Sequence, residues 1–192
     1  MKMKGLRQSN KGFTLVEICV AIVIFTILVS TAVFGLVQWQ EFSIRRQQDE
    51  NAELVYMAAK SKIAKLKANN ALDEQNGWAQ GTKVPSTVSS EYTNKTVYTA
   101  YCQTHDDYEN YKSGTLGNSS AKLLFDLISD SIYDQSVLDA CISIEYLEDG
   151  TIMAVYYSNR CEKFSYNGAA VDLAQRTEET LEENMVGYYI AY

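Results

Sequence analysis

The strongest constraint on this chain is an uncharged run of 20 residues from Ile18 to Val37, made mostly of Ile, Val, Leu, Phe and Ala. A helix of that length spans about 30 Å, which is the thickness of the hydrocarbon core of a bilayer. No later segment of the chain has a comparable run. The sequence therefore predicts one transmembrane helix over residues 18–37, close to the N-terminus.

Charge is distributed unevenly around this run. The chain has 192 residues with 17 basic and 24 acidic side chains, and residues 1–12 hold four basic and no acidic ones, which leaves −11 for residues 13–192. Positively charged flanks of membrane helices stay in the cytoplasm, so residues 1–12 are expected there and the chain after about Trp39 outside. The acidic balance argues against direct nucleic-acid binding by this chain, because Lys and Arg must offset phosphate charge.

A secretory signal peptide is the alternative for this N-terminus, with cleavage after Ala32. Two features weigh against it, because the apolar run continues to Val37 and a carboxylate, Glu17, lies at its front edge. An acid at such a position costs roughly 2.5–3.5 kcal/mol on insertion scales. Glu17 therefore either reaches the headgroup region or has a positively charged partner.

The residues from Lys11 to Glu17 read Lys-Gly-Phe-Thr-Leu-Val-Glu. With its short basic leader and the apolar run behind it, this segment resembles the type IV prepilin signature. That family comprises type IV pilins and the pseudopilins of type II secretion and DNA-uptake systems. The resemblance covers about residues 1–70, and beyond them only the general architecture is similar.

The resemblance implies how the N-terminus is processed. A prepilin peptidase would cut between Gly12 and Phe13, remove the leader 1–12 and methylate the new amine of Phe13. Glycine lets the backbone extend into a protease groove. The Phe13 amine would then pair with Glu17 of the same subunit or of a neighbour. An unpaired buried carboxylate costs several kcal/mol, so this pairing would penalise wrong axial registers.

The resemblance also implies a function and partners. The chain would be a pilin or pilin-like structural subunit of a type IV filament, at the cell surface as a pilus or in the periplasm. The alternatives are a pseudopilin of a type II protein secretion or DNA-uptake system, and a membrane-anchored extracytoplasmic enzyme or binding domain. Its partners would be prepilin peptidase, copies of itself or other pilins through the N-terminal helix, an assembly platform and the membrane.

The expected fold is α+β and type IV pilin-like, with a long N-terminal helix packed on a small antiparallel sheet. One helix is predicted from about Thr14 to Asn69, since no proline or glycine interrupts residues 38–66 and apolar residues recur there every three or four positions. Its membrane half is 13–37, its amphipathic half is 38–70, and a globular head follows over 71–192. The junction could also separate a membrane anchor from a second helix.

Local signals predict the elements of the head. A strand is expected over 96–102, a helix capped by Ser119 or Ser120, and a hairpin over 140–158 that turns at Asp149-Gly150. A two-residue turn would place six residues on the core face: Ile142, Ile144, Tyr146, Met153, Val155 and Tyr157. A third strand is expected over 161–166, then an acidic helix that includes Leu181 and Met185, and a last strand over 186–192.

The sequence contains few candidates for catalytic, cofactor-binding or metal-binding residues. No Ser-His-Asp or Cys-His arrangement and no phosphate-binding glycine loop is present, so no catalytic or cofactor-binding residue is predicted. His105, Asp106, Asp107 and Glu109 could bind a cation, but a run of acids in a loop is usually just solvated and no metal is expected. One disulfide is possible among Cys102, Cys141 and Cys161, the residues do not indicate which pair forms it, and Cys19 is interpreted as a small apolar residue.

Overall fold

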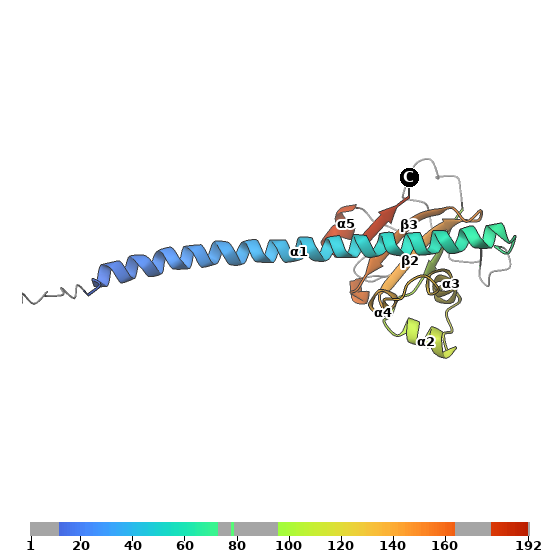
Figure 1. The fold of residues 1–192 in the computed structure, drawn as a ribbon, viewed down its shortest axis with the longest axis horizontal. Coiled ribbons are helices and arrows are strands. Elements are labelled where there is room, and N and C mark those ends of the chain that lie inside the picture. The colour runs from blue at the N-terminus through green and yellow to red at the C-terminus, as the bar shows by residue number, and fades with distance from the viewer. Residues whose placement is uncertain (1–11, 73–77, 79–95, 164–177, 192) are drawn as a thin grey trace, which may run out of the picture. The chain divides into compact units, whose positions relative to one another are not determined.

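The computed structural model describes residues 12–72, 78, 96–163 and 178–191 (Figure 1). The chain divides into two units, with the boundary between Phe42 and Ser43. Helix α1 (Leu15–Ala68) runs through both, which confirms the helix predicted from about Thr14 to Asn69. It ends where Asn70 takes a left-handed backbone, φ 51°, and the Ala71 amide donates to the Leu66 carbonyl at 3.0 Å. This is the bond that closes many helix C-termini.

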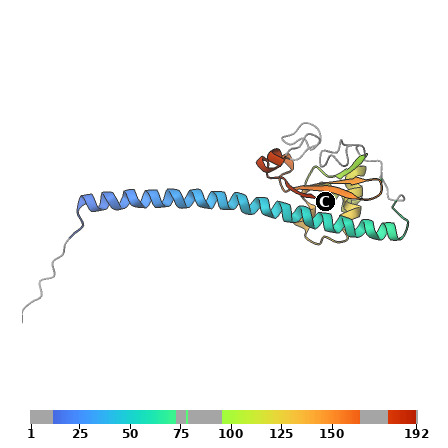
Figure 2. The same ribbon diagram turned by 90° about the horizontal axis from the view of Figure 1, so that it is seen from above.

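Four strands form one antiparallel sheet in the second unit. They are β1 (Val97–Tyr101), β2 (Cys141–Leu147), β3 (Ile152–Ser158) and β4 (Gly187–Ile190), in the spatial order β1-β2-β3-β4. Helices α2 (Asp107–Ser113), α3 (Ser119–Ile128) and α4 (Gln135–Leu138) lie between β1 and β2 in the chain, and α5 (Glu178–Glu183) precedes β4. The expected α+β fold is confirmed, including the strands at both ends of the sheet (Figure 2).

The core lies between one face of the sheet, α3 and the C-terminal half of α1. The predicted apolar stripe of α1 is buried there, at Ala52, Val55, Ala59, Ile63 and Leu66. The sheet contributes Ile142, Ile144, Tyr146, Val155 and Tyr157 to the same cluster. The period of the stripe matches the helix, so the second half of α1 folds as part of the head and not as a separate anchor.

The hairpin differs from the prediction close to its turn. Far from the turn the register is as expected, with Ile144 opposite Val155. A bulge between Glu145 and Tyr146 then places Tyr146 opposite Ile152. Ile152 therefore joins the core, whereas Met153 packs with Val97 and Leu147 in a separate cluster, and its predicted core position was wrong. A one-residue shift moves a side chain to the other face of a sheet.

The predicted N-cap of α3 was wrong. Asn118, not Ser119 or Ser120, caps α3, because its side chain accepts from the Ser120 and Ala121 amides. The Ser120 hydroxyl instead links α3 to β1, accepting from the Tyr101 amide at 3.1 Å and donating to the Thr99 carbonyl at 3.1 Å.

The predicted third strand begins as the 3-10 helix η2 (Cys161–Lys163), and residues 164–166 lie outside the described residues. The acidic helix is present as α5, with Leu181 buried, whereas Met185 lies beyond its end at φ 54°.

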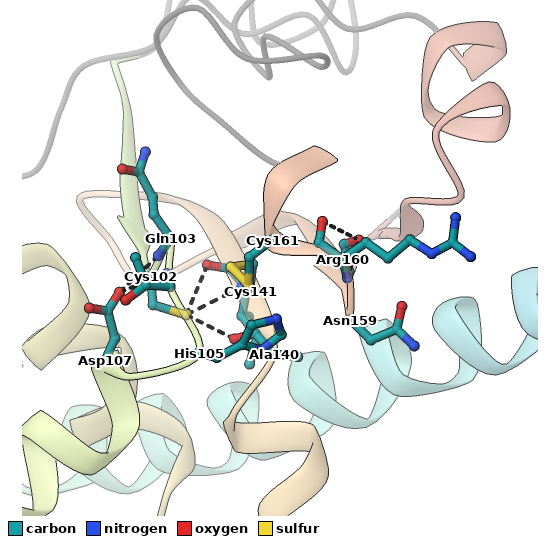
Figure 3. The surroundings of a disulfide bond; sticks show 12 residues. Cys102, Gln103, His105, Asp107, Ala140, Cys141, Asn159, Arg160 and Cys161 are labelled. Atoms are coloured by element: carbon teal, nitrogen blue, oxygen red, sulfur yellow. Dashed lines mark hydrogen bonds between the residues drawn. A yellow bond between two sulfur atoms is a disulfide. The ribbon is translucent and has the colours of Figure 1, made fainter.

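The disulfide joins Cys141 to Cys161 (Figure 3). Ser158 lies opposite Cys141 in the register, but the chain turns back after β3 and brings the Cα atoms of Cys141 and Cys161 to 5.3 Å. Cys102 is a buried free thiol that donates to the Ala140 carbonyl at 3.3 Å and accepts from the Ile142 amide at 3.3 Å. Burial raises the pKa of the Cys102 thiol to about 12, so it stays protonated.

Removing the disulfide should lower stability without changing the fold. The bond closes a loop of about 20 residues, which in the chain-entropy account contributes roughly 3 kcal/mol. We expect Cys161→Ala to lower the Tm by roughly 6–12 °C in thermal unfolding followed by circular dichroism. A reducing agent should produce a similar loss in the unmodified chain and none in the variant. An equal loss in both would contradict this assignment.

Gly187 lets β4 approach α1 closely. A Cβ there would lie 2.2 Å from the carbonyl carbon and 2.3 Å from the carbonyl oxygen of Gln48, which are backbone atoms that cannot rotate away. Gly187→Ala should therefore separate β4 from α1 and cost roughly 1–3 kcal/mol or more in the free energy of unfolding, measured with urea. Gly117→Ala is the matched control, because nothing lies within 4 Å of its Cβ position, and it should be nearly neutral.

The second unit should fold without the membrane half of α1. Its core uses residues from Ala52 onward and none from 13–37. A chain that begins at Gln38 should therefore be soluble and show helical circular dichroism from residues 38–68. Loss of that helical signal would mean that the amphipathic half of α1 depends on the apolar half.

Candidate functional site

The predicted cleavage junction lies in exposed, non-helical chain directly before α1. Gly12, Phe13 and Thr14 precede the helix, and the Phe13 side chain is 82% exposed. No heavy atom lies within 4 Å of the position that a Cβ on Gly12 would take. A peptidase can therefore reach the Gly12–Phe13 bond without unfolding α1.

Glu17 faces back over the start of α1. Its Oε2 accepts from the Thr14 amide at 2.9 Å and from the Thr14 hydroxyl at 2.9 Å, and the Glu17 amide donates to Thr14 Oγ1 at 3.2 Å. These reciprocal bonds form a capping box, in which Thr14 is the N-cap and Glu17 the third helical residue. The capping role of Thr14 was not predicted, although the spacing Thr-x-x-Glu before an apolar run signals it.

The capping box holds the carboxylate near the predicted cleavage junction. Thr14 is the residue after Phe13, so an amine created at Phe13 would lie one residue from the amide that Glu17 already binds. A positive charge at a helix N-terminus is unfavourable unless an acid compensates it. If Phe13 became the N-terminal residue, Glu17 would be the acid nearest to that charge in sequence.

The first half of α1 exposes apolar side chains on every face. All residues from 18 to 37 are exposed in the first unit, with Ile22, Phe25 and Phe34 more than half exposed. Within the described residues, α1 is the one helix that is long and apolar enough to cross a membrane.

Three hydroxyls interrupt this apolar surface, and each donates to a carbonyl of its own helix. Thr26 donates to Val23, Ser30 to Thr26 and Thr31 to Leu28, at 2.7–2.9 Å. None of them needs a partner outside the helix, which suits a segment surrounded by lipid.

Residues 7–33 match the family model of the prokaryotic N-terminal methylation motif. The N-terminus is a prepilin-type methylation motif. This match confirms the resemblance of the sequence to type IV prepilins and pseudopilins, which are structural and not enzymatic proteins. The motif and the apolar part of α1 agree with a single-pass membrane anchor. Neither the curated proteins nor the solved structures contain a significant match to this chain.

In the segment from His105 to Glu109, considered above as a cation site, three side chains contact nearby residues. Asp107 accepts from the Gln103 and Thr104 amides, Glu109 binds Lys112 and Gln135, and His105 Nδ1 lies 2.7 Å from the Asp139 carbonyl oxygen. In the described part of the chain, no three His, Cys, Asp or Glu side chains converge as metal ligands do. The individual roles predicted for Gly12, Phe13 and Glu17 remain predictions.

Proposed function

We propose that this chain is a structural subunit, a pilin or pilin-like protein, of a type IV filament. Prepilin peptidase would cut after Gly12 and methylate Phe13, and the apolar half of α1 would then hold the subunit in the membrane and later in the filament. The observation that carries the proposal is the methylation motif at residues 7–33, with an exposed junction directly before an apolar helix.

The apolar surface of residues 18–37 suits both locations. Lipid tails are as apolar as a neighbouring helix, so moving this surface from lipid to a bundle of helices brings little hydrophobic gain. That surface therefore permits assembly but does not select one axial position. The carboxylate of Glu17 can select it, because only one register brings it to the Phe13 amine of a neighbour and every other register leaves a buried charge unpaired.

A disulfide in the head supports a location outside the cytoplasm. Disulfides form and persist in oxidising compartments, and the head contains the pair Cys141–Cys161. The basic leader before the apolar run predicts the same orientation, with residues 1–12 in the cytoplasm. Pilus, secretion pseudopilus and DNA-uptake filament share this N-terminal chemistry, and we propose the filament class that contains all three.

The test is to follow the chain in a strain with and without its prepilin peptidase. With the peptidase we expect a processed subunit that lacks residues 1–12 and appears in sheared or periplasmic filament fractions that an antibody to the head labels. Without it, the precursor should stay in the membrane and no labelled filament should form. A processed chain that never enters filaments, even when the assembly machinery is active, would contradict the proposed function.

A further inference from the structure

A basic cleft lies within the second unit, where the last turns of α1 meet the β2–β3 turn. It encloses about 350 Å³ and is lined by Tyr56, Lys60 and Lys67 of α1, by Gly150 and Thr151 of the turn, and by Ala191 after β4. Lys60 and Lys67 are seven residues apart, so they share one face of the helix about 10 Å from each other. Gly150 gives the turn room to approach, since a Cβ there would meet Lys67 Cε at 2.8 Å.

Among the residues that the structure describes, the two lysines of this cleft have no acidic partner. The Lys60 ammonium donates to the Tyr56 hydroxyl at 3.1 Å, and no carboxylate of a described residue lines the cleft. Lys62, on another face of the same helix, pairs with Asp130. Among the described residues, neither Lys60 nor Lys67 forms an ion pair. In a chain that is acidic overall, this cleft brings two positive charges, which no described acid neutralises, to a partly enclosed space.

Helix α5 presents the opposite charge. On one side of this helix Leu181 is buried, and Glu182 forms an ion pair with Arg45 of α1 at 3.2 Å. Glu179 and Glu183 are exposed and four residues apart, so their carboxylates project from the same face. This pair therefore forms a short acidic ridge that no basic side chain of the described head neutralises.

The cleft and the acidic ridge cannot meet within one molecule. Glu182 of α5 pairs with Arg45, whereas Lys60 and Lys67 of the cleft lie 15 and 22 residues further along α1. At 1.5 Å per residue these separations are about 22 and 33 Å along the helix axis, beyond the reach of lysine and glutamate side chains. Both views place α5 and the last turns of α1 at opposite ends of the sheet (Figure 2).

We propose that the cleft of one copy, with Lys60 and Lys67, binds the Glu179–Glu183 ridge of a second copy. Two different surfaces meet in this contact, so a pair of copies keeps one free cleft and one free ridge, and the contact can repeat as an open chain. The proposal rests on the proposed filament function, for which it supplies a specific contact between heads. The charges are exposed, and screening over about 8 Å at physiological salt makes the contact sensitive to ionic strength.

The first test uses the full-length chain in its membrane and in any filaments. A carbodiimide joins a lysine amine directly to a glutamate carboxylate, without a spacer, so it links only groups in contact. We expect dimers and a ladder of larger species, with linked peptides that join Lys60 or Lys67 to Glu179 or Glu183. Raising the salt to about 1 M, where screening acts within about 3 Å, should reduce the yield several-fold.

Charge reversal provides the second test. Lys60→Glu with Lys67→Glu, or Glu179→Lys with Glu183→Lys, should each reduce the cross-linked ladder at least fivefold. The four changes combined should restore it, because every contact again joins opposite charges. Lys65→Glu with Lys122→Glu is the matched control, since both side chains are exposed outside the cleft and the net charge changes equally.

The outcomes separate this proposal from the proposed function. Filaments that form normally, without any of these cross-links and without an effect of either reversal, would overturn the head contact and leave the filament role intact. Failure of the combined variant to restore the ladder, when both reversed pairs fold normally by circular dichroism, would also overturn it. Absence of filaments from the unmodified chain would count against the filament role, and the cross-links in the membrane would still decide the contact.

Discussion

Gly12→Val should leave most of the chain as uncleaved precursor. If the peptidase cuts after Gly12, its groove must fit closely around a residue without a side chain, and a β-branched side chain would fill space next to the scissile bond. The fold should be unaffected, because no heavy atom lies within 4 Å of the Cβ position at Gly12. We expect cleavage to slow at least tenfold, which corresponds to about 1.4 kcal/mol in the activation free energy.

Intact-mass measurement gives the result directly. The unmodified chain should lose residues 1–12 and gain one methyl group on Phe13, whereas the variant should keep its full mass. Gly35→Val is the matched control, because Gly35 also has no heavy atom within 4 Å of its Cβ position and lies in the same unit, away from the junction. Normal processing of Gly12→Val would contradict the assigned junction, and a mature chain that begins at Val33 would identify a signal peptide instead.

Features that depend on neighbours in sequence were the ones that could be predicted. The stripe Ala52, Val55, Ala59, Ile63 and Leu66 has the period of a helix, so it indicated both the element and its buried face. The cleavage motif is likewise a linear pattern, and the match at residues 7–33 supports it. Each of these signals is complete within a few turns or a few residues of chain.

The hairpin shows why register was harder to predict. A two-residue turn at Asp149-Gly150 was expected, but the Leu147 amide donates to the Thr151 carbonyl, which leaves three residues in the loop and Gly150 at φ 78°. Hairpin loops of two and of three residues both accept Asp-Gly, so the residue types do not distinguish the two loop lengths. The bulge after Glu145 then restores the register further along the strands. Met153 and Ile152 exchange faces only between these two irregularities.

The disulfide pair and the capping box were absent from the sequence predictions for different reasons. Pairing Cys141 with Cys161 depends on how the chain turns after Ser158, and no local pattern encodes that path. The bonds between Thr14 and Glu17, by contrast, have a clear signature. It was missed because the charge of Glu17, not its hydrogen bonding, was the basis of the prediction. The structure shows that the carboxylate caps the helix, and any test of the predicted pairing must separate it from capping.

Glu17→Val should abolish filament assembly while membrane insertion stays normal or improves. The change removes a carboxylate that costs roughly 2.5–3.5 kcal/mol at the membrane edge, so insertion loses nothing. During assembly, the Phe13 amine of a neighbouring subunit would have no carboxylate to pair with. Wrong axial registers would then no longer be penalised by an unpaired charge. We expect unchanged subunit levels in membranes and at least a tenfold loss from sheared filament fractions. Glu17→Asp should be intermediate, because its charge reaches one methylene less far.

Thr14→Val separates pairing from capping. It removes the hydroxyl that bonds Glu17 and costs about 1 kcal/mol of helix capping, but it keeps the carboxylate. If Glu17 acts through the Phe13 amine, Thr14→Val should assemble nearly as well as the unmodified chain, and Glu17→Gln, which retains a side-chain acceptor without the charge, should fail like Glu17→Val. Equal defects in Thr14→Val and Glu17→Val would show that assembly needs the helix cap, and normal filaments from Glu17→Val would reject the pairing altogether.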